Sequence, residues 1–251
     1  MRILPFVVAA VLALPAMADT PPDIVVLGEV HDNTDAHLGQ ASAISDLRPT
    51  AVVFEMLTDT EAARADADRS QIAAAWEASG WRDFPIYAPI FAALGDARIV
   101  GAAAPREAVR SVYSEGAATL FGADAARFGL TEPLPDDQQQ TRMQMQFEAH
   151  CGAMPIEAMA GMVAVQRYRD AVMARAALAA LKTYGPPVAV IAGNGHARTD
   201  WGVPAAIEKA APEVTTRAIG FVEADTGTPF DEIRLVPPAD RDDPCQTLTS
   251  N

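Results

Sequence analysis

The chain has 251 residues and carries 33 acidic against 19 basic side chains, a formal net charge of −14 at neutral pH. A charge of this sign and size repels phosphate backbones and anionic lipid surfaces, which argues against nucleic acid as a partner. The length is sufficient for one substantial hydrophobic core.

The first 18 residues are typical of a secretory signal peptide. Arg2 precedes an uncharged apolar run over residues 3–14, and residues 16–18 form an A-x-A cleavage pattern. The run is shorter than the ~20 apolar residues that a membrane-spanning helix needs. A buried N-terminal helix is the alternative. No cysteine follows the cleavage position, so no lipid anchor is indicated. We predict a mature chain over residues 19–251, in the periplasm or secreted.

Apolar and small-residue patterns predict strands that alternate with helices along the chain. The expected order is strand 23–28, helix 32–47, strand 50–56, helix 59–80, helix or helical turn 84–96, strand 97–105 and helix 106–116. A loop then covers residues 117–139, and two helices follow at 138–151 and 155–185. The chain closes with strand 187–193, helix 203–212 and strands 214–223 and 230–238, the last two expected as a hairpin.

This order indicates an α/β fold with a mostly parallel central sheet flanked by helices. The helical block, about residues 117–184, interrupts the alternation and is expected as an insertion or cap. No low-complexity linker divides the chain, so residues 19–251 are expected to form a single domain.

Two cysteines, Cys151 and Cys245, remain after export. An oxidising compartment favours a disulfide between them, which would tie the C-terminal tail to the middle of the chain. Two free thiols or a cysteine ligand are the alternatives.

Two of the predicted strands are each followed by the pattern G-x-x-H, at residues 28–31 and 193–196. In open parallel sheets, ligands bind outside the carboxyl ends of the strands. Neighbouring strands lie about 4.8 Å apart. If these strands are neighbours, His31, His196 and Glu29 converge on one pocket.

Glu55 ends the second predicted strand and would join the same pocket. Two histidines with one or two carboxylates are a common shell for zinc, iron or manganese. In a metal-dependent hydrolase, Glu29 or Glu55 would be a further ligand or the base that activates a bound water. The alternative is that each histidine only satisfies hydrogen bonds at a strand end.

Further polar side chains lie after the strands or within the helices, and all are candidates for cofactor binding. Arginine pairs well with carboxylates, and polar residues in the middle of an apolar helix indicate a pocket. The two remaining histidines are either surface residues or extra ligands. This set comprises His37, Arg106, His150, Gln166, Arg169, Asp170 and Arg198.

The segments "LGEVHDN", "VVFEM", "QRYRDAVMA" and "GNGHARTDWGVP" together resemble the ChaN-like haem-binding uptake family of the Tiki/TraB/erythromycin-esterase superfamily. The resemblance spans about residues 24–222. It implies a periplasmic or secreted haem-binding protein that serves haem and iron uptake. Members are described as binding stacked haems between two subunits, so a homodimer and an outer-membrane haem receptor are the expected protein partners.

Other superfamily members imply a different activity. Tiki-like relatives use paired G-x-x-H motifs and a glutamate as a metal-dependent peptidase site, and esterase relatives hydrolyse with a related His and Glu arrangement. Carried over by motif, the shared pocket residues are Glu29, His31, Glu55 and His196. The resemblance does not select the haem ligand among the tyrosines, methionines and remaining histidines. A domain whose pocket has lost its activity is a third interpretation.

Overall fold

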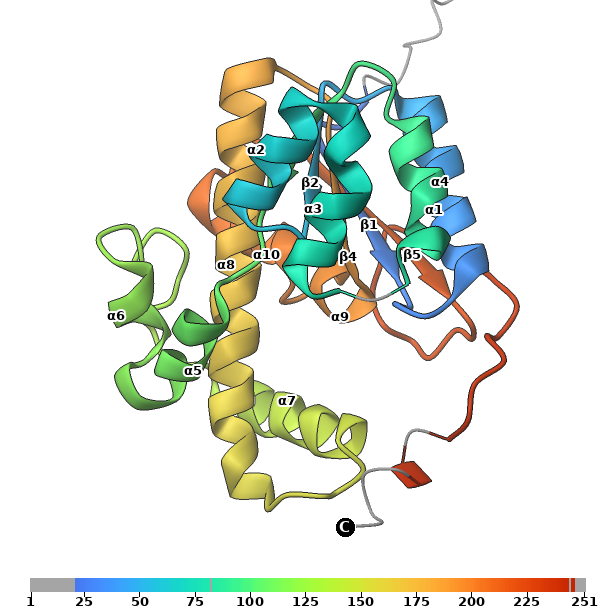
Figure 1. The fold of residues 1–251 in the computed structure, drawn as a ribbon. Helices are drawn as coiled ribbons and strands as arrows, with labels where there is room; N and C mark the ends of the chain where they lie inside the picture. The colour runs from blue at the N-terminus through green and yellow to red at the C-terminus, as the bar shows by residue number, and fades with distance from the viewer. Residues whose placement is uncertain (1–20, 82, 244, 247–251) are drawn as a thin grey trace, which may run out of the picture.

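A six-stranded sheet forms the centre of the molecule (Figure 1). The computed structural model describes residues 21–81, 83–243 and 245–246, so the expected signal peptide lies outside the described residues. The strands are β1 (Ile24–Glu29), β2 (Ala51–Phe54), β3 (Arg98–Gly101), β4 (Val188–Gly193), β5 (Thr216–Val222) and β6 (Glu232–Leu235). They lie in the order β3-β2-β4-β1-β5-β6, and all neighbouring pairs are parallel.

The expected hairpin between the last two strands is wrong, because β5 and β6 run parallel. The segment between them carries the chain back along the sheet before β6 begins. Asp231 marks this return, since its backbone N–H donates to the backbone oxygen of Ala218 near the start of β5 and its side chain accepts the Ala218 N–H.

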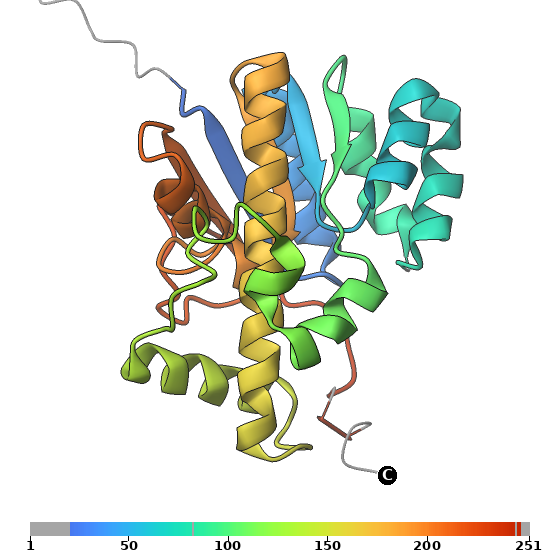
Figure 2. The same cartoon turned by 90° about the vertical axis from the view of Figure 1, so that its left-hand side faces the viewer.

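Helices cover both faces of the sheet, as Figures 1 and 2 show from two directions. On one face lie α1 (Thr34–Leu47), α2 (Asp59–Ala67), α3 (Ile72–Ser79) and α4 (Phe84–Ala93), with the 3-10 turn η1 (Arg69–Gln71) between α2 and α3. The helix expected over 59–80 is therefore interrupted. Asp68 has an extended backbone, and its side chain accepts the N–H of Ser70, which ends α2 and starts a new turn.

On the other face lie α5 (Arg106–Glu115), α6 (Ala117–Phe121), α8 (Met159–Tyr184) and α10 (Val203–Ala210). Successive residues of β1 alternate between the two cores, Val25 and Leu27 on one side and Ile24 and Val26 on the other. This alternation follows from the two-residue period of a strand.

The helical block is continuous with the core. The C-terminal half of α8 packs small side chains such as Ala174 and Ala177 against the sheet. Its N-terminal half extends past the carboxyl ends of the strands together with α7 (Asp136–Ala149) and the turn η2 (Ile156–Ala158) (Figure 1). We call α7, η2 and residues 150–165 the arm. Within the part of the chain that the structure describes, no helix is long and apolar enough to cross a membrane.

Candidate functional site

The strand order places both G-x-x-H motifs at one edge of the sheet. β4 lies between β1 and β2, and Glu29 pairs directly with Gly193. After Gly193 the chain forms α9 (Asn194–Ala197), a single helical turn that contains His196. The carboxyl ends of β1, β2 and β4 therefore bring together Glu29, Glu55 and His196.

Gly28 allows α9 to pack directly on β1. A Cβ atom at position 28 would lie 2.4 Å from Asn194 Oδ1 and 2.7 Å from the Cβ of Ala197. We expect Gly28→Ala to lower the free energy of unfolding by about 1–3 kcal/mol, because α9 must shift. Urea denaturation measures this. Gly195→Ala is the matched control, since a Cβ there would meet its nearest atom at 3.4 Å. Equal stability of the two variants would contradict the close packing.

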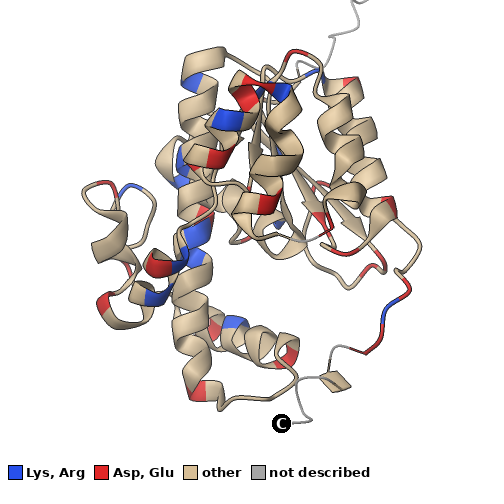
Figure 3. Cartoon of the chain, viewed as in Figure 1, with Lys and Arg blue, Asp and Glu red and all other residues tan. Residues whose placement is uncertain are grey.

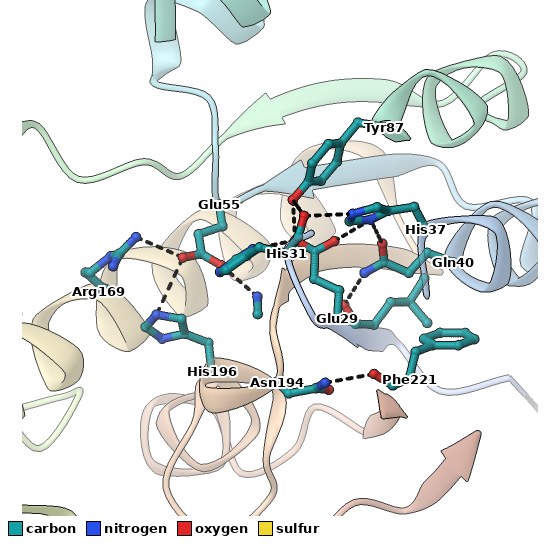
Figure 4. A network of polar contacts seen from close by, with 12 residues as sticks. Glu29, His31, His37, Gln40, Glu55, Tyr87, Arg169, Asn194, His196 and Phe221 are labelled. Carbon is teal, nitrogen blue, oxygen red and sulfur yellow. Dashed lines mark hydrogen bonds and ion pairs between the residues drawn. The ribbon is translucent and has the colours of Figure 1, made fainter. Parts of the chain in front are cut away.

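A first buried network surrounds Glu29 (Figure 4). One carboxylate oxygen accepts the Tyr87 hydroxyl at 2.7 Å and contacts Nδ1 of His31 at 2.7 Å, and the other lies 2.8 Å from Nδ1 of His37. Nε2 of His37 donates to the backbone oxygen of His31 at 3.1 Å. Gln40 donates to the backbone oxygen of Leu27 in β1. The network thus holds both the side chain and the backbone of His31.

The charges in this network stabilise one another. Burial would raise the pKa of Glu29, but the hydrogen bonds from His31 and His37 outweigh it and lower that pKa to about 2. Burial opposes protonation of both histidines, yet their contacts with Glu29 raise the pKa of each above its usual value. Burial and the adjacent Glu29 raise the pKa of Tyr87, so its hydroxyl stays a hydrogen-bond donor.

A second buried network surrounds Glu55. Arg169 donates to Oε1 of Glu55 at 2.8 Å, and the backbone N–H of Gly193 donates to Oε2 at 2.8 Å. Nε2 of His196 lies 3.6 Å from Oε1. Burial would raise the pKa of Glu55, but the charges of His196 and Arg169 outweigh it and lower that pKa. Asp170 contacts Nδ1 of His196 at 2.6 Å, and its own pKa is raised by burial.

Both motif histidines share one arrangement. Nδ1 of His31 contacts Glu29 and Nδ1 of His196 contacts Asp170, each at hydrogen-bond distance. A carboxylate on one ring nitrogen fixes the orientation of a histidine and frees the other nitrogen, as in many metal sites. Among the described residues, however, no group of three or more His, Cys, Asp or Glu side chains is arranged to hold a metal ion.

A cavity of ≈ 660 Å³ opens beside these networks, next to the ends of β1, β2 and β3. His31, Glu55 and Arg169 border it, Trp81 and Val109 add apolar surface, and α5 contributes Arg106 and Arg110. Figure 3 shows the basic residues gathering along α5 and the middle of α8. In a chain of net charge −14, this concentration of arginine favours an anionic ligand.

The structure separates the remaining sequence candidates. Gln166 contacts His196, on the far side from the cavity. Arg198 does not reach the cavity, because it forms two hydrogen bonds with Asp200 and stacks on Trp201. His150 lies at the end of α7 in the arm, where its ring donates to a backbone carbonyl.

Three assignments from the sequence change. The surface alternative for His37 is wrong, because His37 is fully buried. Glu29 contacts His31 and does not line the cavity, whereas Glu55, although buried, borders it. Tyr87 belongs to the site, although sequence reasoning considered it only as a haem ligand. It carries the sole polar side-chain group in the apolar helix α4, which is the signal that identifies it.

An all-parallel α/β sheet with a cavity at the carboxyl ends of its strands is the arrangement in which such sheets bind ligands, and it defines a ligand-pocket protein. The chain belongs to the family described as haem-binding uptake, Tiki superfamily, ChaN, which matches residues 18–207. Among solved structures, it is similar to ChaN of Campylobacter jejuni, which is described as showing cofacial haem binding. The two share 19% identity at a TM-score of 0.63, over 84% of this chain and 86% of that one.

A second solved structure, a succinoglycan biosynthesis protein, aligns with 11% identity and a TM-score of 0.34, over 80% of this chain and 66% of that one. No inference rests on this likeness. No curated protein matches the chain. The first structure supports the fold, and the family membership supports the expectation from the sequence motifs.

Proposed function

We propose that this protein binds haem in the cavity at the carboxyl edge of its sheet and that it serves haem or iron uptake. The family supports the ligand class. The observation that carries the location is the cavity lining, which combines the apolar side chains of Trp81 and Val109 with Arg106 and Arg110. Haem requires apolar surface for its ring, cations for its two carboxylates and a donor for its iron. These residues supply the apolar surface and the cations.

Two donors lie near this wall. His31 borders the cavity with its side chain 43% exposed. Tyr113 stands one turn beyond Arg110 on α5 and is 54% exposed. His37, Tyr87 and Tyr168 are buried, so none of them meets the iron without rearrangement.

A haem titration followed by absorbance and Trp81 fluorescence tests the proposal. We expect a saturable shift of the Soret band, and we expect the double variant Arg106→Ala/Arg110→Ala to weaken binding about 10- to 100-fold. Loss of one charge-assisted hydrogen bond costs ~1.5 kcal/mol, and ~1.4 kcal/mol is a factor of ten in Kd. Arg217→Ala, which removes an exposed arginine near the start of β5, is the control. Unsaturable haem binding, or equal affinity in the arginine variants, would contradict the proposal.

The variants His31→Ala and Tyr113→Phe assign the iron donor, because loss of the donor changes the ligand-field bands of the spectrum. We further propose a periplasmic or secreted location, a homodimer and exchange with an outer-membrane haem receptor. The signal-peptide pattern supports the location, and the family resemblance supports the partners. N-terminal sequencing of exported protein and light scattering with and without haem test these points.

We propose metal-dependent hydrolysis as the second candidate function, because both motif histidines are anchored by buried carboxylates. These side chains form no ready metal site, so His31, His196 and Glu55 would have to move together to hold a divalent ion, which would supply an activated water. Elemental analysis and hydrolysis of an activated ester test this candidate in His31→Ala and His196→Ala, with His150→Ala as control. Wild-type metal content in both site variants would exclude it.

A further inference from the structure

Arg106 reaches from one helical layer of the molecule to the other beside the cavity. It is the first residue of α5, and α5 and α3 lie on opposite faces of the sheet (Figures 1 and 2). Its guanidinium nevertheless lies against Gly80 at the end of α3, because a Cβ atom at position 80 would be 2.9 Å from Nη2 of Arg106. Both residues line the cavity. The side chain therefore spans the carboxyl edge of the sheet between two elements of the cavity lining.

The charges of the two helix ends favour this position. A helix carries partial positive charge at its N-terminus and partial negative charge at its C-terminus. Arg106 stands at the N-terminus of its own helix, where a cation is unfavourable, and the last turn of α3 has no basic side chain. Within the described part of the chain, the guanidinium of Arg106 forms no hydrogen bond or ion pair. The end of α3 thus places the cation, which stays available to a ligand.

The turn that carries Gly80 is fixed by the backbone of α3. Gly80 ends the helix with a left-handed backbone, φ 80°, and its N–H donates to the backbone oxygen of Glu77. The Ser79 hydroxyl donates to the backbone oxygen of Trp76 at 2.7 Å and accepts the N–H of Trp81 at 3.2 Å. Gly80 is therefore a fixed support for the guanidinium that lies against it.

The same turn supplies apolar surface. Trp81 follows Gly80 and lines the cavity, and its ring centroid lies 5.0 Å from that of His31. Arg169 also lines the cavity, but it donates to the carboxylate of Glu55 at 2.8 Å, which offsets its charge. The turn at the end of α3 thus brings an unpaired cation next to an aromatic ring.

We propose that Gly80 is a positioning residue, which holds Arg106 for the carboxylate of a ligand whose apolar part contacts Trp81. This inference rests on the proposed function for the identity of the ligand. A side chain at position 80 would occupy the place of the guanidinium, so Arg106 would shift. Because Nη2 is the end of a flexible side chain, the shift displaces the cation without unfolding the cavity. A cation that is placed in advance raises affinity, since its side chain is not ordered at the moment of binding.

The first experiment compares haem with its dimethyl ester, which has the same ring and no carboxylate. Both are titrated into wild-type protein, Gly80→Ala, Arg106→Ala and the combined variant, after circular dichroism verifies folding. We expect each single variant to weaken haem binding about three- to tenfold, up to the factor that one charge-assisted hydrogen bond contributes. Affinity for the ester should stay unchanged. The combined variant should match Arg106→Ala, because both changes act through one group.

Gly95→Ala is the matched control. Gly95 also has a left-handed backbone, φ 54°, and a Cβ atom there would meet nothing within 4 Å. The control therefore introduces similar backbone strain and displaces no cation, so it should bind haem as wild type does. Wild-type haem affinity in Gly80→Ala, an equal loss of affinity for the ester, or additive losses in the combined variant would each overturn the proposal.

A second measurement needs no haem and separates the positioning role from the proposed function. Iodide, an anion, and acrylamide, a neutral molecule, both quench tryptophan fluorescence. The difference between each protein and its Trp81→Phe form isolates the signal of Trp81. We expect Gly80→Ala and Arg106→Ala to lower iodide quenching of Trp81 about twofold at constant ionic strength, because a nearby cation concentrates anions. Acrylamide quenching should not change.

The two measurements fail in different ways. Unchanged iodide quenching in Gly80→Ala would overturn the positioning role whether or not the protein binds haem. If iodide quenching falls and wild-type protein binds no haem, the proposed function fails while the positioning role stands.

Discussion

Replacement of Glu29 by alanine is expected to lower the free energy of unfolding by about 3–5 kcal/mol at pH 5.5, because it leaves the charged and buried His37, and His31 beside it, without their partner. Glu29 is 2% exposed and contacts His31, His37 and Tyr87. The lowered pKa of Glu29 and the raised pKa values of the two histidines arise from the same contacts. Their contributions to the free energy of unfolding are therefore not added together.

The pH dependence of this effect has a defined sign. The pKa of Glu29 is lowered from 4.5 to about 2, so its contribution is complete above pH 4.5 and is lost as the pH falls through about 2. The pKa values of His31 and His37 are raised from 6.5. Their contribution is complete below pH 6.5 and is lost as the pH rises through the raised values. The difference between wild type and Glu29→Ala should therefore be largest between about pH 4.5 and 6.5.

Urea denaturation from pH 4 to pH 9 measures this profile. Glu232→Ala is the control, because Glu232 forms salt bridges with Arg217 and Arg234 near the surface, and such pairs contribute about 0–1 kcal/mol. A Glu29→Ala penalty of the same size as the control, or one that stays constant across the range, would show that the network carries no net charge stabilisation.

Removal of the disulfide is expected to lower the free energy of unfolding by about 2–4 kcal/mol. Cys151 and Cys245 are 94 residues apart in the sequence, so the bond restricts a long loop of the unfolded chain. The double variant Cys151→Ser/Cys245→Ser should also show a larger denaturant m-value, because its unfolded state exposes more surface.

Reductant provides the internal control for this prediction. Wild-type protein unfolded with reductant should match the double variant, and the variant should not respond to reductant. A double variant as stable as oxidised wild type would mean that the bond does not restrict the unfolded chain, and the unfolded-state explanation would then be wrong.

The sequence predicts the α/β fold because buried parallel strands appear as short apolar runs between helical patterns. Each of the four strands that deliver the site was expected within a few residues of its observed range. The convergence of Glu29, Glu55 and His196 also follows from the sequence, since parallel strands end at one edge. The parallel pairing of β5 and β6 does not, because the segment between them contains no helix whose pattern would indicate a crossover.

Side-chain partners are harder to predict than positions. His37 and Gln40 both lie on the buried side of α1, where polar residues are normally absent. Their partners on β1 are Glu29 for His37 and the backbone oxygen of Leu27 for Gln40, and a helix pattern does not reveal them. Arg198 shows the opposite case, because its partner Asp200 is two residues away in the sequence. The pattern R-x-D at residues 198–200 indicates an ion pair between near neighbours in the sequence. Such a pair occupies the arginine, which then does not contact a ligand.

The place of β4 between β1 and β2 has a consequence for the order of folding. β1 and β2 have no direct pairing in the sheet, and their shared neighbour comes more than 130 residues later. The first hundred residues therefore cannot complete the central sheet until residues 188–193 are available. Such non-local pairing slows folding, because the chain must close a long loop before contacts compensate for the lost entropy. A chain that stops at Tyr184 should therefore lack the carboxyl-edge cavity, although every residue that lines this cavity precedes Tyr184.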